Sequence, residues 1–417
     1  MLILTVIPSI DPTKGGPSEC IINLIPELNK YGFIHDVVCL DNPNAAFLQN
    51  TSFKTYALGD AKNAWNYNKK LIPWLRKNVL RYDMVVVHTL WGYHGYAVNK
   101  VLKELRNKNS RYYVMPHGML DPYFQTAKER KLKAIRNLFY WAFIEKKVIN
   151  EAEGILFTCD AERQLAQKTF NNYHPKKEII VGIGIYSPPS KQASFVDAFY
   201  KALNTSKRNP YILFLSRIDC KKGIDILITA YAKIVEANNL ETLPDLVIAG
   251  SGIEKEFGLT IQKMVTSNKL LEGKVHFPGM LRDEAKWGAF YGSEAFILPS
   301  HQENFGIVVV EALACKKVVL ITDKVNIYSV IKDEQAGIVE SDNEEGIYNL
   351  LNNWLHLSAQ EKNNMSLNAF NCFQKHYTIQ NTALNFKKLY EEYTVPTATQ
   401  HPSSMKINLY NSKPSVV

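Results

Sequence analysis

Short runs of β-branched residues alternate with longer amphipathic segments through most of the chain. This alternation is typical of parallel sheets covered on both faces by helices. It occurs in two successive series, so the sequence predicts an α/β protein with two doubly wound units. The first series predicts strands at 2–7, 35–40, 84–88, 111–115, 154–158 and 177–181 with helices including 17–31 and 128–150, and the second predicts strands at 211–215, 245–249, 274–278, 295–298 and 318–321.

The segment between the two series, residues 186–210, contains Pro188, Pro189 and Pro210 and is interpreted as a linker. Two doubly wound units joined by a hinge form a cleft, and their ligands collect at the carboxyl ends of the strands. The motifs described below fall at such positions. The stretch from residue 395 onward is polar and rich in Pro and Ser, so we expect it to be poorly ordered.

Composition narrows the class of protein further. The 417 residues suggest two to three domains, and 46% hydrophobic with 21% charged residues is the composition of a soluble globular protein. The first apolar stretch is too short to span a bilayer, and the six cysteines are irregularly spaced, so we expect a cytoplasmic protein without disulfides. The net charge of +9 suits an anionic partner, but no nucleic-acid-binding motif accompanies it.

The most informative motif is FILPSHQENFGIVVVEALA, residues 296–314. A buried strand is expected to end near Pro299, and an apolar helix to open near Gly306. Glu303 precedes that helix and Glu311 lies on it, eight positions later, which corresponds to about 12 Å of helical rise. Backbone amides around Asn304, Phe305 and Gly306 would hold an anion between these two carboxylates.

Cations that would accompany such an anion occur in LSRIDCKKGID. Arg217 follows the strand at 211–215, and Lys222 precedes Gly223, where the next helix is expected to start. Arg binds a diphosphate in a bidentate manner and Lys acts as a point charge, although a solvated basic loop has the same composition. Gly15 and Gly16 follow the first strand and would let the backbone approach a phosphate, or only form a turn.

Two further strands are followed by histidines. HGMLDP places His117 at a strand end, and HTLWGYHGY places His88, Trp91, Tyr93 and His94 after another strand. Histidines at strand ends that face a cleft are candidates for a functional site, and among these His117 is the strongest. The alternative is that they are structural.

The ordered set GGPS, HGM, SRIDCKKG, LVIAGSG, VHFPGML and ENFGIVVVEALA resembles the retaining glycosyltransferases of family 4, also called glycosyl transferases group 1, which have the GT-B fold. The resemblance extends to about residue 392. The segments HGMLDP and TDKVNIYSVI are most similar to the exopolysaccharide-biosynthesis enzymes of that family. The resemblance implies two Rossmann-like doubly wound domains that face each other across a cleft.

The resemblance also implies a domain plan. Residues 1–190 would bind the acceptor and residues 208–375 the nucleotide sugar. Residues 376–394 would form a C-terminal helix that crosses back to the first domain, and residues 395–417 a flexible tail.

Site residues carry over from the same motifs. Glu303 is expected to contact hydroxyls of the donor sugar, Glu311 the ribose, and Arg217 with Lys222 the diphosphate. His117 would lie beside the donor sugar, and the remaining donor-binding residues would be Gly15, Gly16, Gly279, Met280, Asn304, Phe305 and Gly306. For the acceptor we expect His88, Trp91, Tyr93 and Asp121. The chain departs from the family at Gly182–Ile183–Gly184 and at Lys316–Lys317–Val318. The resemblance therefore does not determine the shape of these two loops.

The implied function is transfer of a hexose, with glucose from UDP-glucose as the best guess, to a growing polysaccharide or a lipid-linked saccharide. Neither a cofactor nor a metal is expected, because no DxD motif of the metal-dependent transferases is present. One alternative is a non-catalytic nucleotide-sugar-binding subunit. Another is a dinucleotide-dependent oxidoreductase, suggested by GIGIYS at Gly182 and AGSGIEKEF at residues 249–257, although neither completes GxGxxG before a helix.

Residues 128–148 hold seven Lys or Arg, two Glu, and the aromatic residues Phe139, Tyr140, Trp141 and Phe143. Such a helix can lie on anionic lipid, which would make the protein peripheral on the inner face of the plasma membrane. An ordinary surface helix whose aromatics fill the core explains the composition equally well.

Overall fold

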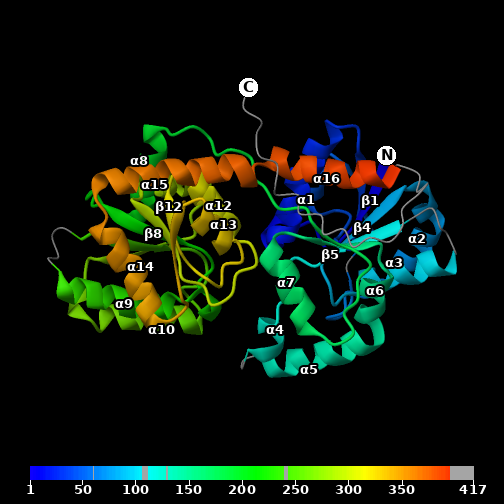
Figure 1. The fold of residues 1–417 in the computed structure, drawn as a ribbon, viewed down its shortest axis with the longest axis horizontal. Coiled ribbons are helices and arrows are strands. Elements are labelled where there is room, and N and C mark those ends of the chain that lie inside the picture. Colours follow the sequence, from blue (N-terminus) through cyan, green and yellow to red (C-terminus); the bar gives the residue numbers. More distant parts are fainter. Residues whose placement is uncertain (60, 106–110, 128–129, 239–242, 395–417) are drawn as a thin grey trace. The chain divides into compact units, whose positions relative to one another are not determined.

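The computed structural model describes residues 1–59, 61–105, 111–127, 130–238 and 243–394 (Figure 1). It divides the chain into two compact units. Among the described residues, the N-terminal unit contains Met1–Gly184 and Ile379–Thr394, and the C-terminal unit contains Ile185–Thr378. The expected tail, residues 395–417, lies outside the described residues.

The N-terminal unit is built on a seven-stranded parallel sheet in the order β3-β2-β1-β4-β5-β6-β7. Its strands are β1 (Leu2–Val6), β2 (Ile34–Cys39), β3 (Lys54–Ala57), β4 (Met84–His88), β5 (Arg111–Met115), β6 (Gly154–Phe157) and β7 (Glu178–Ile180). Its helices are α1 (Gly16–Asn29), α2 (Leu71–Asn78), α3 (Tyr93–Glu104), α4 (Tyr123–Thr126), α5 (Lys131–Tyr140), α6 (Lys146–Glu151), α7 (Asp160–Thr169) and α16 (Ile379–Thr394).

The C-terminal unit is built on a six-stranded parallel sheet in the order β10-β9-β8-β11-β12-β13. Its strands are β8 (Tyr211–Leu215), β9 (Asp245–Ala249), β10 (Val275–Gly279), β11 (Ala295–Leu298), β12 (Val318–Thr322) and β13 (Gly337–Glu340). Its helices are α8 (Ala193–Leu203), α9 (Ile224–Ala237), α10 (Glu256–Thr266), α11 (Asp283–Gly292), α12 (Ile307–Ala314), α13 (Tyr328–Asp333), α14 (Glu344–His356) and α15 (Ala359–Cys372).

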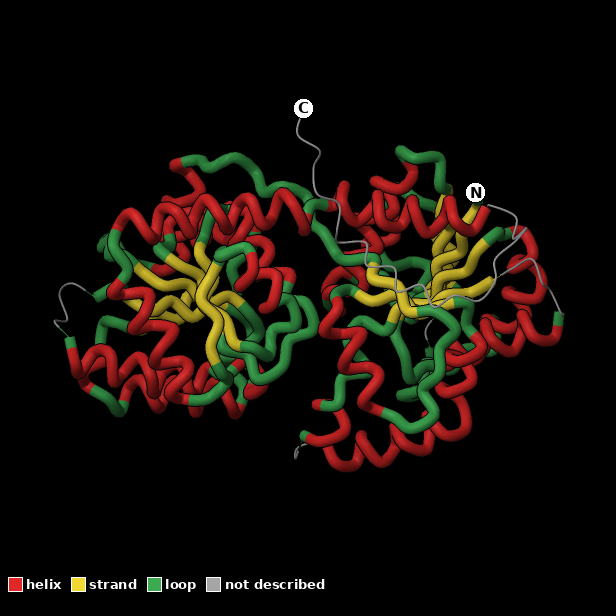
Figure 2. Tube along the Cα trace, in the orientation of Figure 1, coloured by secondary structure: helices red, strands yellow, loops and turns green. Residues whose placement is uncertain are grey.

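Both sheets reverse their strand order once, between β1 and β4 in one unit and between β8 and β11 in the other. Interior strands such as β9, β11 and β12 are buried on both faces, because helices cover each sheet on both sides (Figure 2). In open α/β sheets a ligand binds outside the carboxyl ends of the strands at such a reversal. The fold therefore directs attention to the loops after β1, β4, β8 and β11.

The α/β prediction is confirmed, and all eleven predicted strands are present to within two residues at each end. Two strands were not predicted, β3 and β13. Both lie at sheet edges, where one side faces no neighbouring strand, so their short sequences KTYA and GIVE lack the continuous apolar run of an interior strand.

The interpretation of residues 186–210 as a linker is wrong for its central part, which forms α8 in the C-terminal unit. Phe195 and Phe199 on one face of α8 are buried. The helix also approaches α11 so closely that a Cβ on Gly288 would lie 1.8 Å from the Phe195 carbonyl oxygen. The prolines on both sides of this segment led to its interpretation as a linker, although an amphipathic helix lies between them.

The C-terminal segment forms α16, which belongs to the N-terminal unit. It packs beside α1 (Figure 1), and the Tyr390 ring lies 5.0 Å from the Phe33 ring. Among the described residues, no helix combines the length and the apolar character that crossing a bilayer requires.

Glycines allow the backbones of neighbouring loops in the C-terminal unit to lie in contact. A prediction about stability follows from this contact. Gly250, after β9, has φ +149°, and a Cβ there would lie 1.7 Å from the Ser216 carbonyl oxygen. Gly273 has φ +68° with nothing within 4 Å of its Cβ position. We expect Gly250→Ala to lower the free energy of unfolding by roughly 2 kcal/mol more than Gly273→Ala, because only the former adds a backbone clash to the strain of positive φ. Urea unfolding of both variants measures the difference, and equal losses would contradict the packing described.

Candidate functional site

Two loops meet at the strand reversal of the C-terminal sheet. One runs from β8 to α9 and the other from β11 to α12, and these two strands pair side by side. The loops are in direct backbone contact, since His301 N donates to the Lys221 carbonyl oxygen at 2.8 Å. A Cβ on Gly223 would lie 2.1 Å from the Pro299 carbonyl oxygen, so glycine is required there. This contact brings the SRIDCKKG and ENFG motifs together.

Lys222 and Glu303 form an ion pair between these loops. Lys222 lies in a 3-10 turn in which Lys221 N donates to the Asp219 carboxylate, and only 4% of Lys222 is exposed. The Glu303 backbone is fixed from its other side, because its N–H donates to the Lys324 carbonyl oxygen at 2.9 Å and its carbonyl accepts from Asn326 N at 3.0 Å. Three loops thus place one lysine and one carboxylate against each other.

Positive charge exceeds negative charge around this pair. Burial by itself raises the pKa of Glu303, but the charge and hydrogen bond of Lys222, together with the charges of Lys221 and Arg217, outweigh burial and hold the pKa below its ordinary value. Three cations therefore act on one carboxylate. Arg217 is exposed, and its guanidinium forms no ion pair with any carboxylate in the described part of the chain.

Helix starts add to the positive potential. α9 begins after Gly223 and α12 after Gly306, both with positive φ. The first amides of a helix lack intrahelical partners, and the helix dipole adds partial positive charge there. The arrangement of two helix starts and the cations Arg217, Lys221 and Lys222 suits a polyanion such as a diphosphate.

The other residues predicted in this unit are more widely distributed. Glu311 lies on α12 and its carboxylate accepts from Lys286 of α11 at 2.6 Å. Phe305 is buried, with its ring against Tyr377, so only its backbone is available to a ligand. Gly279 ends β10 with φ +74°, and Met280 after it is exposed.

The argument from helical rise between Glu303 and Glu311 is wrong, because α12 begins only at Ile307. Glu303 instead lies in a loop that bridges to Val325. Sequence reasoning missed Lys286 and Lys221. The KK pair pointed to Lys221. No sequence motif pointed to Lys286, because it meets Glu311 only in the folded unit.

In the N-terminal unit, the loop after β1 begins α1 at Gly16, and Gly15 before it has φ +112°. Asp41, at the end of β2, holds this loop by accepting from Ser9 Oγ at 2.5 Å and from Ile10 N at 2.8 Å. No sequence motif identified Asp41 as a residue that holds this loop. The predicted role of the two glycines beside a phosphate stays a prediction.

The loops after β4 and β5 bring histidines together. His88 Nδ1 lies 2.9 Å from His117 Nε2, and His94 Nε2 lies 2.9 Å from the His88 carbonyl oxygen. Burial lowers the pKa of His117 and of His94 to about 4, and burial with the neighbouring histidines lowers the pKa of His88 well below its ordinary value. All three imidazoles are therefore neutral near pH 7.

The other candidates for acceptor binding are less accessible than expected. Tyr93 is buried, with its ring against Trp65 and Tyr67. Asp121 is buried too and accepts from Tyr123 N, while Trp91 packs against Phe170. Their assignment to the acceptor stays a prediction, and the geometry favours a structural role for Tyr93.

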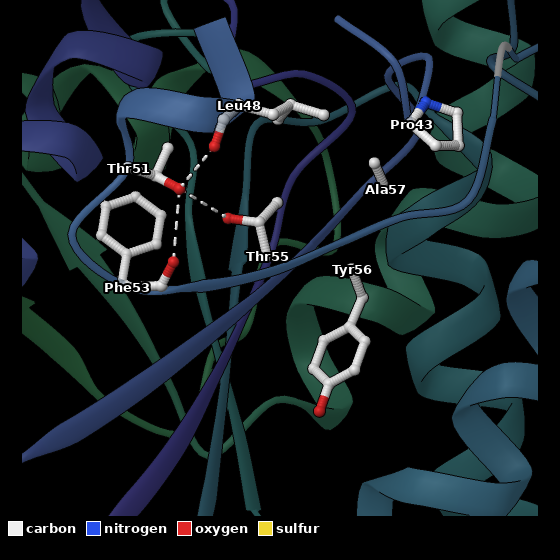
Figure 3. Close-up of a pocket in the computed structure, with 7 residues that line it drawn as sticks. All are labelled: Pro43, Leu48, Thr51, Phe53, Thr55, Tyr56 and Ala57. Atoms are coloured by element: carbon white, nitrogen blue, oxygen red, sulfur yellow. Dashed lines mark hydrogen bonds between the residues drawn. The ribbon is translucent and has the colours of Figure 1, made fainter.

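A separate cavity of about 490 Å³ lies beside the edge strand β3 (Figure 3). Its hydroxyl groups are already engaged, since Thr51 Oγ donates to the Leu48 carbonyl oxygen at 3.0 Å and lies 3.5 Å from Thr55 Oγ. The lining contains no cation. This cavity is therefore distinct in chemistry from the anion site of the C-terminal unit. Within the described ranges, no three His, Cys, Asp or Glu side chains gather so as to hold a metal ion.

Comparison with known proteins finds a family match for part of the chain. Residues 196–371 match the family described as Glycosyl transferases group 1. The segment contains the β8 and β11 loops with Lys222, Glu303 and Glu311.

Two relatives with matching segments are glycosyltransferases. An uncharacterized glycosyltransferase of Methanocaldococcus jannaschii is 32% identical over 142 residues, which is 34% of each chain. An N-acetylgalactosaminyltransferase of Campylobacter jejuni that acts on a diphospho-undecaprenol-linked sugar is 34% identical over 143 residues, 34% of this chain and 36% of that protein. The matches thus span about a third of the length of these two relatives.

Similarity of fold extends over nearly the whole chain. HepE of Anabaena, solved in complex with UDP and glucose, matches with a TM-score of 0.72 at 16% identity, covering 94% of this chain and 100% of that chain. The two parallel sheets are those of the GT-B glycosyltransferase fold.

The Lys222–Glu303 pair generates a prediction about stability. We expect Lys222→Met to lower the free energy of unfolding at pH 7 by roughly 3 kcal/mol, because a largely buried carboxylate loses its ion pair. The matched control is Lys233→Met, whose partner Glu344 forms an exposed pair, and we expect that loss to stay below about 1 kcal/mol.

The same pair makes the loss pH-dependent. The folded-state pKa of Glu303 is lowered, so its contribution is present above the pKa of the unfolded chain and disappears as pH falls through the folded value. Urea unfolding from pH 7 to about pH 3 should therefore show that the difference in unfolding free energy between Lys222→Met and wild type becomes smaller below the ordinary carboxylate pKa. A gap that is constant with pH would contradict the ion pair.

Proposed function

We propose that this protein is a retaining glycosyltransferase that moves a hexose from a nucleotide sugar, with UDP-glucose as the first candidate, to a growing polysaccharide or a lipid-linked saccharide. The observation that carries the proposal is the set of three cations and two helix starts around Glu303 at the strand reversal of the group 1 domain. A nucleotide sugar presents the diphosphate that this set suits. The complex of HepE with UDP and glucose, in a protein of the same fold, supports the choice of donor to test.

In the proposed reaction, the bond between the anomeric carbon and the diphosphate oxygen breaks as the acceptor oxygen bonds to the same face of the sugar. The acceptor proton passes to the departing phosphate oxygen. Negative charge accumulates on the diphosphate, so Arg217, Lys222 and the amides of α12 would lower the barrier by electrostatic stabilisation. These groups supply the positive charge for this step, and we propose that no metal takes part.

Glu303 would orient the donor sugar by accepting from its hydroxyls, because its carboxylate is ionised and fixed by three loops. Glu311, held by Lys286, would accept from the ribose. His117 is neutral near pH 7, so it would contribute a hydrogen bond to the sugar rather than a charge to the diphosphate.

The oxidoreductase alternative loses its basis in the glycine motifs. Gly250 and Gly252 are close to backbone of the β8 loop, with Cβ positions 1.7 Å from the Ser216 oxygen and 2.8 Å from the Ile218 oxygen. Loop packing therefore explains these glycines without a dinucleotide. The GIGI segment does not open a helix, since α8 starts only at Ala193.

Turnover tests the proposal. Purified protein incubated with UDP-glucose and other nucleotide sugars should release the nucleoside diphosphate, faster when a saccharide acceptor is present. We expect Arg217→Ala to lower kcat/KM by about 10²–10³, because a preorganised charge on the leaving group is lost. Arg208→Ala, at an exposed arginine paired with Asp197, should leave the rate unchanged.

Two further measurements test the finer points. Proton NMR of the product should show the donor's anomeric configuration, and activity should survive treatment with a chelator. Tight UDP binding without turnover on any nucleotide sugar would favour a non-catalytic binding subunit instead.

We also propose that α5 and the residues after it attach the protein to an anionic bilayer. Large apolar side chains are exposed along this segment, with 85% of Leu132, 64% of Phe139 and 71% of Phe143 accessible. Lys131, Lys133 and Arg136 are exposed beside them. Trp141 turns inward instead and stacks on Phe170, and Tyr140 packs against Trp65 and Trp91. Phe139 and Phe143 are the two aromatic residues of the segment that remain exposed. The predicted helix at 128–150 is interrupted by a π-helical turn at Trp141–Glu145, and residues 128 and 129 lie outside the described part.

Vesicle binding tests this attachment. The protein should co-sediment with vesicles that contain phosphatidylglycerol, and more weakly with phosphatidylcholine alone or in high salt. Replacing Phe139 and Phe143 by Ser should weaken binding at least about tenfold, because each buried phenyl ring contributes roughly 1.5–3 kcal/mol. Leu259→Ser, at a 55% exposed leucine of the other unit, is the control. Equal partition of all variants would contradict the attachment.

A further inference from the structure

The loop that carries His117 has an unusual backbone. Met119 N donates to the Pro116 carbonyl oxygen at 3.2 Å, which closes a four-residue turn. Its two central residues, His117 and Gly118, have φ of +52° and +80°. Glycine adopts this conformation freely, but histidine does so rarely. The position of the imidazole therefore depends on groups that hold the turn in this form.

The same edge of the sheet holds two more residues of this kind. Thr89 and Trp91, in the loop after the neighbouring strand β4, have φ of +70° and +64°. Strained residues persist only where their surroundings determine them, and they gather at functional sites. His117 is bonded to His88 at the end of β4, so the strained loops are connected through the two imidazoles.

Glu162 is the group that holds the turn. It lies on α7, after β6, and only 3% of it is exposed. One carboxylate oxygen accepts from Gly118 N at 2.5 Å, and the other accepts from Thr158 N at 2.7 Å and Thr158 Oγ at 2.5 Å. The carboxylate therefore ties the centre of the turn after β5 to the end of β6, and both of its oxygens are engaged by donors.

We infer that Glu162 is a positioning residue that fixes the His117–Gly118 turn and thereby sets where the His117 imidazole lies. This inference rests on the proposed function, in which His117 meets the donor sugar. An amide at position 162 cannot replace the carboxylate, because its NH₂ group would face either Gly118 N–H or the two donors of Thr158.

The experiment uses the full chain labelled with ring-¹³C histidine and ¹⁵N glycine. The His117 and Gly118 signals are assigned as those lost in His117→Gln and Gly118→Ala. In wild type, the Gly118 amide proton should be shifted downfield and exchange slowly, because it donates to a carboxylate. In Glu162→Gln we expect the Gly118 amide proton to lose its downfield shift and to exchange faster. We also expect the chemical shift of the His117 ring signal to change.

Kinetic measurements should distinguish a local displacement of His117 from a general loss of structure. We expect kcat of Glu162→Gln to fall roughly 10–100-fold, because a small displacement of a positioned group costs about that much, while KM for the nucleotide sugar stays near the wild-type value. Glu178→Gln is the matched control, since its carboxylate accepts from Tyr173 and Gln167 and does not touch the turn. Thr158→Ala removes one donor and should produce a smaller change in the same direction, which provides a second variant should Glu162→Gln not fold.

Unchanged Gly118 and His117 signals in Glu162→Gln would overturn the inference, and so would a displaced turn with wild-type kcat. A wild-type protein that transfers no sugar from any nucleotide sugar would refute the proposed function instead. In that case the NMR signals still decide whether Glu162 sets the position of His117.

Discussion

The ion pair between Lys222 and Glu303 is the interaction on which the candidate site depends. A lysine that is 4% exposed is costly unless a carboxylate meets it, and here the carboxylate comes from a loop on the neighbouring strand. The pair therefore requires β8 and β11 to be adjacent, with their loops in backbone contact. Lys221 and Arg217 then leave the region with a surplus of positive charge. One structural requirement, the neutralisation of a buried lysine, thus also gathers the cations that the proposed function assigns to a diphosphate.

Close backbone contact is what allows that pair to form, and glycines permit it. A Cβ at Gly223 or at Gly250 would penetrate a carbonyl oxygen of the next loop. Gly250, together with Gly252, gave the sequence part of its likeness to a dinucleotide fingerprint. In the structure the function of Gly250 and Gly252 is internal, because the β8 loop lies directly against them. A glycine motif therefore distinguishes between ligands only when the atoms opposite each glycine are known.

Those features that depend on local sequence could be predicted, and those that depend on packing between distant segments could not. Interior strands such as Tyr211–Leu215 are buried on both faces and read as continuous apolar runs. The edge strands Lys54–Ala57 and Gly337–Glu340 lack that signal, and α8 was hidden between prolines. Within the site, the loop positions of Lys222 and Glu303 followed from strand ends and helix starts. The partner of Glu311 did not, because Lys286 is 25 residues away in the chain and meets it only in the folded unit.

The two units differ in the polar groups that they present. The C-terminal unit gathers full charges, since Lys221, Lys222 and Arg217 surround one ionised carboxylate. The N-terminal unit gathers imidazoles that burial keeps neutral, on a backbone strained at three positions. A neutral imidazole is a poor partner for a diphosphate but a good one for a hydroxyl, to which it can donate or from which it can accept. The N-terminal unit tolerates this strain because Glu162 holds the His117–Gly118 turn by hydrogen bonds. In the C-terminal unit, the attraction between Lys222 and Glu303 holds the loops together instead. The proposed chemistry thus assigns the departing charge to one unit and the sugar hydroxyls in part to the other.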